Sequence, residues 1–456
     1  MKNIGIIDLG SNSTRLLVVK VLSNKSFKIL DEIKEVVRLG KDIQEDGSLN
    51  PKRVKAALLT LEYFKRVCES YEVTEIVAVA TAAVRAAKDQ QAFLRMVKDT
   101  VGLEIRVLSG EEEAFYDYFG IVNSLDFTEG LIIDIGGAST EIIYVKNREN
   151  KESVSLPFGA ITLTDMFDLS DEIKEENLVK LRNYLVNQYN SLPWLSKIKG
   201  TVLIGVGGTV RNMGKICRKD KNYSLDLTHN YVIDKETVKE MAKMVSGTNL
   251  KQRKKLKGLS KSRVDIFVGA CEAVKVLFEY CKAGELIVSG NGVKEGLVYE
   301  YLQGGKIAVD NVLAFSLHNL MLQYDVNEMR IDKVWQQAKY AYKTSRLTYN
   351  MDERALGLLK IAVKLYTIGI QISYYDFYKH SFYMILHARI NGLSHREVLM
   401  VAYTILYHPK EDLNNLVYGY RDILSEEDID TTQKLGSILK MAIDFPSISV
   451  DGIMND

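Results

Sequence analysis

One stretch of this sequence combines residue types that can bind both phosphate and a metal ion. Residues 131–145, LIIDIGGASTEIIYV, form two apolar runs separated by a glycine turn. Glycine allows backbone N–H groups to approach an anion closely, and hydroxyl side chains add further donors. Asp134, which ends the first run, could hold a divalent cation directly or through water. The candidate phosphate-binding residues of this turn are Gly136, Gly137, Ala138, Ser139 and Thr140.

A second copy of this motif occurs near the N-terminus, whereas an isolated one would be more typical of an ordinary β-hairpin. Residues 4–21, IGIIDLGSNSTRLLVVKV, align with it so that Asp8 matches Asp134, and the other matched pairs have the same separation. Such self-similarity indicates two copies of one supersecondary unit. Arg15 aligns with Glu141, so one copy carries a cation suited to phosphate and the other a carboxylate suited to handling water. The candidate phosphate-binding residues of the first copy are Gly10, Ser11, Asn12, Ser13 and Thr14.

Two such hairpins in similar domains imply a cleft in which an anion is held from both walls. A third candidate anion site follows the predicted strand 201–206, because a helix N-terminus presents free N–H groups. The basic stretch 251–263 is either a solvated surface or, through Arg263 and its lysines, a guide for a polyanion. The residues at the predicted helix start are Gly207, Gly208 and Thr209.

Three consecutive glutamates are candidates for a general base. The segment SGEEEA predicts a helix with Glu111, Glu112 and Glu113 in its first turn. Acidic residues there interact favourably with the positive end of the helix dipole, which is the plain structural explanation. The functional alternative is that one of them enters the cleft as a general base, and periodicity does not choose which. Arg85, which follows the predicted strand 75–81, is either a phosphate contact or a surface arginine.

The composition limits the classes of partner. The chain has 456 residues, and domains of roughly 100–200 residues predict three of them. Its 60 basic and 59 acidic residues leave a net charge of +1, so overall charge does not recruit nucleic acid or membrane. No apolar run nears the ~18–20 residues of a membrane helix, and the start shows no signal pattern. We expect a cytoplasmic protein with neither zinc nor disulfides, because no CxxC spacing links Cys68, Cys217, Cys271 and Cys281.

The elements that must position these residues predict an α/β fold followed by helices. Asn50 and Pro51 are typical of a helix start, and residues 172–191 predict an exposed helix. Residues 306–456 show apolar spacing typical of helices throughout. The predicted strands of the first domain are 4–9, 15–22, 27–36, 75–81 and 103–108.

Six motifs occur in the order DLGSNSTRL, ATAAVR, SGEEEA, DIGGASTE, VGGT and SGNGVKEGL. Together they closely resemble the exopolyphosphatase/guanosine pentaphosphate phosphohydrolase (Ppx/GppA) family over roughly the first two-thirds of the chain. The resemblance implies two actin-like (ribonuclease-H-like) α/β domains, residues 1–124 and 125–304, flanking a phosphate cleft. It also implies Mg²⁺-dependent release of terminal phosphate from inorganic polyphosphate, or removal of the 5′ phosphate from guanosine pentaphosphate.

The resemblance also implies roles for individual residues. The family's base maps to Glu113, and its turn glutamate and hairpin arginine map to Glu141 and Arg15. We expect Mg²⁺ near Asp134, with help from Asp8 and Glu141, and charge stabilisation by Arg15 with Arg85. No cysteine or histidine lies in the motifs, so a covalent phosphoenzyme is not expected.

Two motifs depart from the family pattern. Ala138 replaces the usual third glycine, and its methyl group is expected to narrow the approach of phosphate. In SGNGVKEG, Gly290 and Asn291 stand where Asp is common, and Lys294 stands where Arg is common. These departures weaken the case for a nucleotide contact at that turn.

The C-terminal region, residues 305–456, resembles an HD-type helical domain without its metal pair. Tyr366 and Thr367 occupy the expected His-Asp positions, and neither is a normal ligand for a divalent metal. We therefore predict no metal chemistry there, and a role in widening the substrate surface or forming a homodimer. Core or surface roles are also the more common outcome for the scattered histidines His380, His387, His395 and His408.

Three alternatives to polyphosphate hydrolysis remain at the level of sequence. The first is the same chemistry on guanosine pentaphosphate. The second is an ATP-dependent kinase or ATPase of the same fold, for which the sequence has no acceptor signature. The third is a binding or sensing protein that keeps the cleft without catalysis, and Ala138 is its best support.

Overall fold

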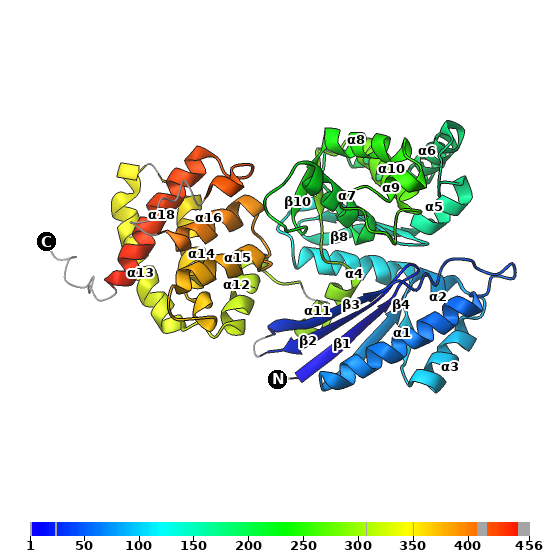
Figure 1. Ribbon diagram of the computed structural model, residues 1–456, viewed down its shortest axis with the longest axis horizontal. Coiled ribbons are helices and arrows are strands. Elements are labelled where there is room, and N and C mark those ends of the chain that lie inside the picture. The colour runs from blue at the N-terminus through cyan, green and yellow to red at the C-terminus, as the bar shows by residue number, and fades with distance from the viewer. Residues whose placement is uncertain (1, 23–24, 307, 350, 408–416, 446–456) are drawn as a thin grey trace. The chain divides into compact units, whose positions relative to one another are not determined.

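The computed structural model describes residues 2–22, 25–306, 308–349, 351–407 and 417–445. The chain divides into two compact units (Figure 1). Unit 1 comprises residues 1–222 and 228–310, and unit 2 comprises residues 223–227 and 311–456. Within the described ranges, the helices are all too short or too polar to span a membrane.

Unit 1 contains two sheets with matching strand order. The five-stranded sheet runs β3-β2-β1-β4-β5, and the six-stranded sheet runs β8-β7-β6-β9-β11-β10. Each begins with three antiparallel strands, after which two strands join in parallel, so the predicted duplication is confirmed in the topology. The first sheet consists of β1 (Lys2–Leu9), β2 (Thr14–Val21), β3 (Phe27–Glu35), β4 (Val73–Ala80) and β5 (Ile105–Val107). The second consists of β6 (Glu129–Ile135), β7 (Thr140–Lys146), β8 (Glu149–Leu156), β9 (Leu203–Val206), β10 (Tyr231–Asp234) and β11 (Glu285–Val288).

The strand register preserves the alignment of the two motifs. Asp8 pairs with Arg15 across β1 and β2, and Asp134 pairs with Glu141 across β6 and β7. Directly opposed residues of an antiparallel pair project from the same face of the sheet. Each hairpin therefore presents its acidic residue beside the side chain that distinguishes the two copies.

Helices cover both faces of the first sheet. Helix α1 (Pro51–Ser70) begins as predicted, with the Asn50 side chain accepting a hydrogen bond from the Lys52 N–H. With α3 (Gln90–Val101) it covers one face, and the short α2 (Ala82–Ala86) follows β4. The other face packs on α4 (Gly110–Val122) and α11 (Val293–Gln303). Since α11 follows the last strand of the second sheet, the chain crosses back to the first sheet there.

Six of the described helices lie beside the second sheet. One of them, α6, corresponds to the helix predicted over residues 172–191. Helix α4 also packs against β7 and β8, so α4 and α11 lie between the two sheets (Figure 1). The six helices are α5 (Ala160–Phe167), α6 (Glu175–Asn190), α7 (Gly207–Asp220), α8 (Lys235–Ser246), α9 (Leu250–Arg253) and α10 (Phe267–Tyr280).

Unit 2 is helical, as predicted for the residues that the structure describes. Tyr366 is buried in its core, and the Arg330 Nε–H donates to the Tyr366 hydroxyl at 3.0 Å. In the described part of the chain, no three His, Cys, Asp or Glu side chains are grouped so that they could hold a metal ion. The helices are α12 (Val312–Gln323), α13 (Glu328–Tyr349), α14 (Glu353–Leu365), α15 (Phe377–His387), α16 (His395–Leu406) and α18 (Glu426–Asp444).

The scattered histidines of unit 2 have ordinary surroundings. His395 is buried, and its Nδ1 lies 2.9 Å from the Tyr223 hydroxyl. His387 is exposed and packs against the Tyr383 ring. His380 is half-buried, and the fourth, His408, lies outside the described residues.

Helices α4 and α11 cross at glycines. A Cβ on Gly296 would lie 2.2 Å from the Tyr116 carbonyl oxygen, and one on Gly120 would lie 2.4 Å from the Gly292 carbonyl oxygen. Such distances are too short for any side chain, so the two helices touch through their backbones.

We expect Gly296→Ala to lower the free energy of unfolding by about 1–3 kcal/mol, because the added methyl group overpacks this crossing. Urea unfolding followed by circular dichroism measures the change. Gly284→Ala is the matched control, since a Cβ there would meet no atom within 4 Å. Equal stabilities of the two variants would contradict this account of the crossing.

Candidate active site

Residues from both sheets line one hollow in unit 1. We call the part carrying the five-stranded sheet the first lobe and the part carrying the six-stranded sheet the second lobe. The glycine turns of the two lobes meet there, because a Cβ on Gly137 would lie 2.8 Å from the Ser11 Cβ. The predicted site residues that line the hollow are Asp8, Gly10, Ser11, Asn12, Ser13, Arg15, Glu113, Asp134, Gly136, Gly137, Ser139, Gly207, Gly208 and Arg263.

The N-terminus of α7 opens into this hollow. Gly207 has a φ of +79°, and a Cβ on it would lie 2.2 Å from Asp134 Oδ1, so only glycine fits. Val206 precedes the helix without a side-chain cap, which leaves the first backbone N–H groups of α7 without a capping acceptor. Free N–H groups and the helix dipole make this end suitable for an anion.

The structure distinguishes the three glutamates at the start of α4. Glu111 is exposed, and the Glu112 side chain caps the helix by accepting from the Ser109 N–H at 2.9 Å. Glu113 is buried and lines the hollow. Desolvation raises the pKa of Glu113 to about 7, although a 2.8 Å hydrogen bond from Arg85 Nη1 acts in the opposite direction. Glu113 is therefore the carboxylate of the three that is placed to act as a base.

Some residues that were predicted to bind phosphate do not line the hollow. The hydroxyl of Thr140 donates to the Phe158 carbonyl at 2.7 Å, and that of Thr209 accepts from Arg263 Nη1 at 3.3 Å. Thr14 is fully buried, as these two residues are. The three threonines are therefore buried beneath the turns and do not line the hollow themselves.

Arg85 and Ala138 line a second, mostly apolar hollow beside the first, and Ser139 lines both. Arg85 donates to Glu113 and to the Leu108 carbonyl, so it is a partner of the candidate base in this structure. The backbone of Ala138 does not have a positive φ. Its methyl group therefore fits without strain and is absent from the lining of the phosphate hollow, which corrects the expectation that it narrows the approach of phosphate.

Glu141 is also buried behind the lining. The Ser155 hydroxyl donates to Glu141 Oε1 at 2.7 Å. Desolvation, followed by repulsion from Glu113 and Asp134, raises the pKa of Glu141 well above its usual value. Glu141 therefore lies beneath the acidic residues that line the hollow and is not part of the lining itself.

Sequence reasoning missed Asp117, which lies one helical turn after Glu113 on α4. Asp117 is fully buried, and its carboxyl oxygens accept no hydrogen bond from an N–H or hydroxyl group. Desolvation and the neighbouring Asp134 and Glu141 carboxyls raise the pKa of Asp117 well above its usual value. The four-residue spacing from Glu113 was the available signal.

Asp8 and Asp134 present carboxylate oxygens from the two facing hairpins. Desolvation raises the pKa of Asp8 to about 6 and also raises that of Asp134. Mg²⁺ is usually bound by one or two carboxylates together with waters and phosphate oxygens. Asp8 and Asp134 both line the hollow and are ligands of this type, and the described residues include no group of three metal-binding side chains.

Basic residues line the same hollow or lie beside it, and the sequence analysis did not name two of them. Desolvation lowers the pKa of Arg211 to about 9 and that of Arg263 to about 10, and repulsion from Arg15 adds to both shifts. Lys34 is an exposed residue directly opposite Arg15 across β2 and β3, yet desolvation and repulsion lower its pKa to about 8. Like charges that face each other are unfavourable unless an anion lies nearby. The missed residues are Arg211 and Lys34.

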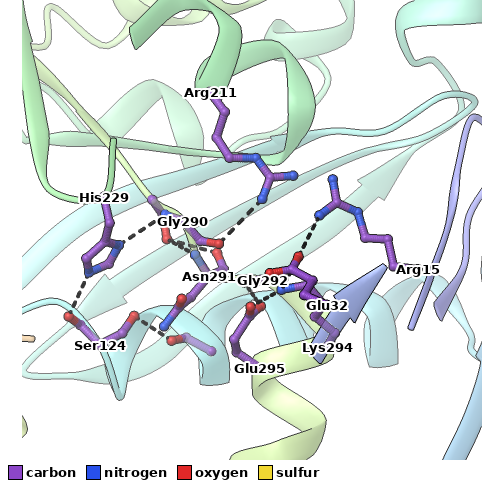
Figure 2. A network of polar contacts seen from close by, with 12 residues as sticks. Arg15, Glu32, Ser124, Arg211, His229, Gly290, Asn291, Gly292, Lys294 and Glu295 are labelled. Atoms are coloured by element: carbon purple, nitrogen blue, oxygen red, sulfur yellow. Dashed lines mark hydrogen bonds and ion pairs between the residues drawn. The ribbon is translucent and has the colours of Figure 1, made fainter. Parts of the chain in front are cut away.

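The SGNG turn is anchored beside Arg211 (Figure 2). The Gly290 N–H donates to His229 Nδ1 at 3.0 Å, and His229 Nε2 lies 3.2 Å from the Ser124 carbonyl. Arg211 Nη1 donates to the Gly290 carbonyl at 3.4 Å. Gly290 therefore contributes two backbone contacts that hold the turn beside Arg211.

Glu32 bridges two cations at the edge of the hollow (Figure 2). Its Oε1 lies 3.5 Å from Arg15 Nη1 and 3.2 Å from Lys294 Nζ. Lys294 also forms an ion pair with Glu295. These two cationic side chains are thus held in place by carboxylates.

The structure defines a two-lobed α/β protein with a charged hollow between opposed glycine turns. A family model described as the Ppx/GppA phosphatase family matches residues 17–304, and one described as Ppx/GppA phosphatase, domain III, matches residues 313–446. The chain therefore belongs to the Ppx/GppA phosphatase family.

Individual relatives and a solved structure agree with this assignment. The chain is 26% identical to a guanosine-5′-triphosphate,3′-diphosphate pyrophosphatase of Vibrio vulnificus, over 87% of this chain and 78% of that protein. It is 27% identical to a bifunctional 3-dehydroquinate synthase/phosphatase of Fusobacterium nucleatum, over 64% of this chain but only 46% of that protein. The crystal structure of an exopolyphosphatase from Cytophaga hutchinsonii matches with a TM-score of 0.63 and 25% identity, covering 68% of this chain and 100% of that one.

We expect Glu113→Gln to change how stability depends on pH. The folded-state pKa of Glu113 is raised, so its contribution to stability falls as pH rises from about 4.5 to about 7. Glutamine cannot ionise, so the free energy of unfolding of the variant should gain about 1–3 kcal/mol relative to the parent between pH 5 and pH 8.

Denaturant unfolding in metal-free buffer at several pH values measures this difference. Glu111→Gln, an exposed change on the same helix turn, is the control and should keep the parental profile. Parallel profiles for Glu113→Gln and the parent would show that Glu113 is not held in a desolvated environment.

Proposed function

We propose that this protein is an exopolyphosphatase, which hydrolyses the terminal phosphoanhydride bond of inorganic polyphosphate and releases orthophosphate. One observation carries the proposal: the buried Glu113 lines the same hollow as two glycine turns, two aspartates and several arginines. The solved exopolyphosphatase with a similar fold supports the choice of substrate. The family assignment supports the reaction class.

The backbone and the arginines are suited to hold the terminal phosphates. The N–H groups of the two turns and of the α7 N-terminus would donate to phosphate oxygens. Arg15, Arg211 and Arg263 would offset negative charge as it shifts in the transition state. Phosphoryl transfer depends mainly on such positioning and charge stabilisation. A bound polyanion would also relieve the repulsion among these cations.

Glu113 would act as the general base. It would take a proton from a water molecule while the water oxygen bonds to the terminal phosphorus and the bond from phosphorus to the bridging oxygen breaks. The shortened polyphosphate leaves with the electron pair of that bond. A pKa of about 7 suits a base that works near neutral pH. Arg85 would orient the carboxylate through its 2.8 Å hydrogen bond.

Asp134 and Asp8 would hold Mg²⁺, and Glu141 would stabilise Asp134 from behind. When bound, the ion would neutralise negative charge on the terminal phosphates. The two aspartates support this proposal because they provide oxygen ligands from opposite walls of the hollow.

Guanosine pentaphosphate is the second candidate substrate, and the apolar hollow is the observation that favours it. A purine base gains from apolar contacts, whereas a polyphosphate chain has no apolar part. The hollow adjoins the phosphate site at Ser139. The relative from Vibrio vulnificus bears the name of that activity. The apolar and small residues that line the hollow include Ala82, Ala83, Ala86, Ala87, Leu156 and Pro157.

We also propose that the two lobes are actin-like domains and that unit 2 is an HD-like domain without its metal pair. The repeated strand order supports the first assignment. Tyr366, which stands at the expected His position, is buried in the helical core and accepts a hydrogen bond from the exposed Arg330, and this supports the second.

We expect the protein to release orthophosphate from long-chain polyphosphate in the presence of Mg²⁺ and to lose this activity in excess EDTA. A phosphate-release assay with polyphosphate and guanosine pentaphosphate side by side measures it. Faster release from the pentaphosphate would favour the second candidate. Tight binding of polyphosphate without any release would contradict both and indicate a binding protein.

We expect Glu113→Gln to lower turnover by about 10²–10⁴-fold, the usual contribution of a positioned base, with little change in polyphosphate binding. Steady-state kinetics and equilibrium binding measure the two effects separately. Glu111→Gln should retain parental turnover, since its side chain is exposed. Near-parental turnover in Glu113→Gln would remove Glu113 from the role of base.

A further inference from the structure

The loop that follows β3 is bonded to the phosphate-facing turn of the first lobe. The Arg38 N–H donates to the Asn12 carbonyl at 3.0 Å, and the Gly40 N–H donates to the Ser11 carbonyl at 2.9 Å. Arg38 has a φ of +54°, an uncommon conformation for a residue with a side chain. The surrounding contacts hold the loop in this conformation, and they connect it directly to the lining of the hollow.

The side chain of Arg38 extends from this loop to the second lobe. Its Nη1 donates to Asp265 Oδ2 at 2.6 Å, and its Nη2 donates to Asp265 Oδ1 at 3.0 Å and to the Ser262 carbonyl at 2.9 Å. The Arg38 and Asp265 side chains are 19% and 20% exposed. Lys41 Nζ lies farther away, 3.8 Å from Asp265 Oδ2. A bidentate arginine–carboxylate pair that is largely shielded from water is a strong and directional contact.

The segment that receives Arg38 also presents Arg263 to the hollow. The Arg263 N–H donates to the Ser260 carbonyl, and the Ile266 N–H donates to the Arg263 carbonyl, so residues 260–266 form a compact turn. The buried Arg253 secures this turn through a 3.0 Å hydrogen bond to the Val264 carbonyl. Asp265 therefore belongs to the same compact turn as Arg263, which lines the hollow.

We propose that Arg38 and Asp265 form a latch that holds the two lobes closed around the phosphates, and that both are positioning residues for the reaction. Neither lines the hollow, so each acts through its neighbours. Arg38 acts through Ser11 and Asn12 in the first lobe, and Asp265 acts through Arg263 in the second. This inference rests on the proposed hydrolysis of a phosphate chain. Closure of lobes around a substrate completes the binding constellation and excludes water.

A double-mutant cycle of Arg38→Gln and Asp265→Asn tests the latch. We expect each single change to raise the KM for polyphosphate about tenfold or more, and to lower turnover less, because both walls lose their alignment. The KM of the double variant should be no higher than that of the more impaired single variant, since both changes remove the same Arg38–Asp265 contact. The reversed pair, Arg38→Asp with Asp265→Arg, should recover part of the loss. Additive effects in the cycle, or an unchanged KM, would overturn the proposal.

Arg53→Gln is the matched control. Arg53 forms a 2.9 Å ion pair with Asp42 within the first lobe, and its loss should leave KM at the parental value. Urea unfolding of all variants separates the latch from a purely structural pair, since coupling in stability without coupling in KM would also overturn the proposal.

Calorimetric binding of tripolyphosphate to the same variants gives a readout without turnover. If the parent releases no phosphate from either substrate, the proposed function fails, whereas coupled losses of tripolyphosphate affinity at Arg38 and Asp265 would still support the latch. Uncoupled affinities would overturn it.

Discussion

The site depends on the close contact of two backbone turns. Gly137 lies against Ser11, and Gly159 packs on Gly137. A Cβ added to Gly159 would lie 2.6 Å from the Gly137 carbonyl carbon. Gly207 approaches Asp134 equally closely. The Gly137–Ser11 contact brings the turns of the two lobes together, and the other two contacts leave no space for a side chain within the second lobe.

The resulting hollow contains two sets of charges that are each unfavourable without a ligand. Desolvation raises the pKa of Asp8, Glu113, Asp117 and Glu141, and it lowers the pKa of Arg211 and Arg263. The same physical cause acts in opposite directions because burial disfavours the charged form of every group. A phosphate chain would stabilise the cations, and a divalent cation would stabilise the carboxylates. The charges of the hollow are therefore complementary to both the proposed substrate and the proposed metal ion.

The two central helices connect this chemistry to the fold. Helix α4 begins three residues before Glu113 and α11 begins one residue before Lys294, and the helices pack through Gly120 and Gly296. Both helices contact the first sheet, and α4 also contacts the second. The candidate base and one of the rim cations are therefore positioned relative to both lobes by a single helix pair.

Sequence alone determined the duplicated hairpin, the glycine turns, the acidic start of α4 and the helical nature of the described C-terminal residues. These features follow from backbone preferences and apolar spacing between residues close together in the chain, which a linear pattern records directly. The structure then added the matching strand order of the two sheets.

Only the tertiary structure decided that Glu113 enters the hollow while Glu112 caps the helix, and that Arg85 bonds to Glu113. It also revealed Asp117, Lys34 and Arg211, and it placed the Ala138 methyl group outside the phosphate hollow. Burial, pKa and hydrogen-bond partners depend on segments that are distant in sequence and adjacent in space. No local pattern specifies which of several similar side chains those distant segments will cover.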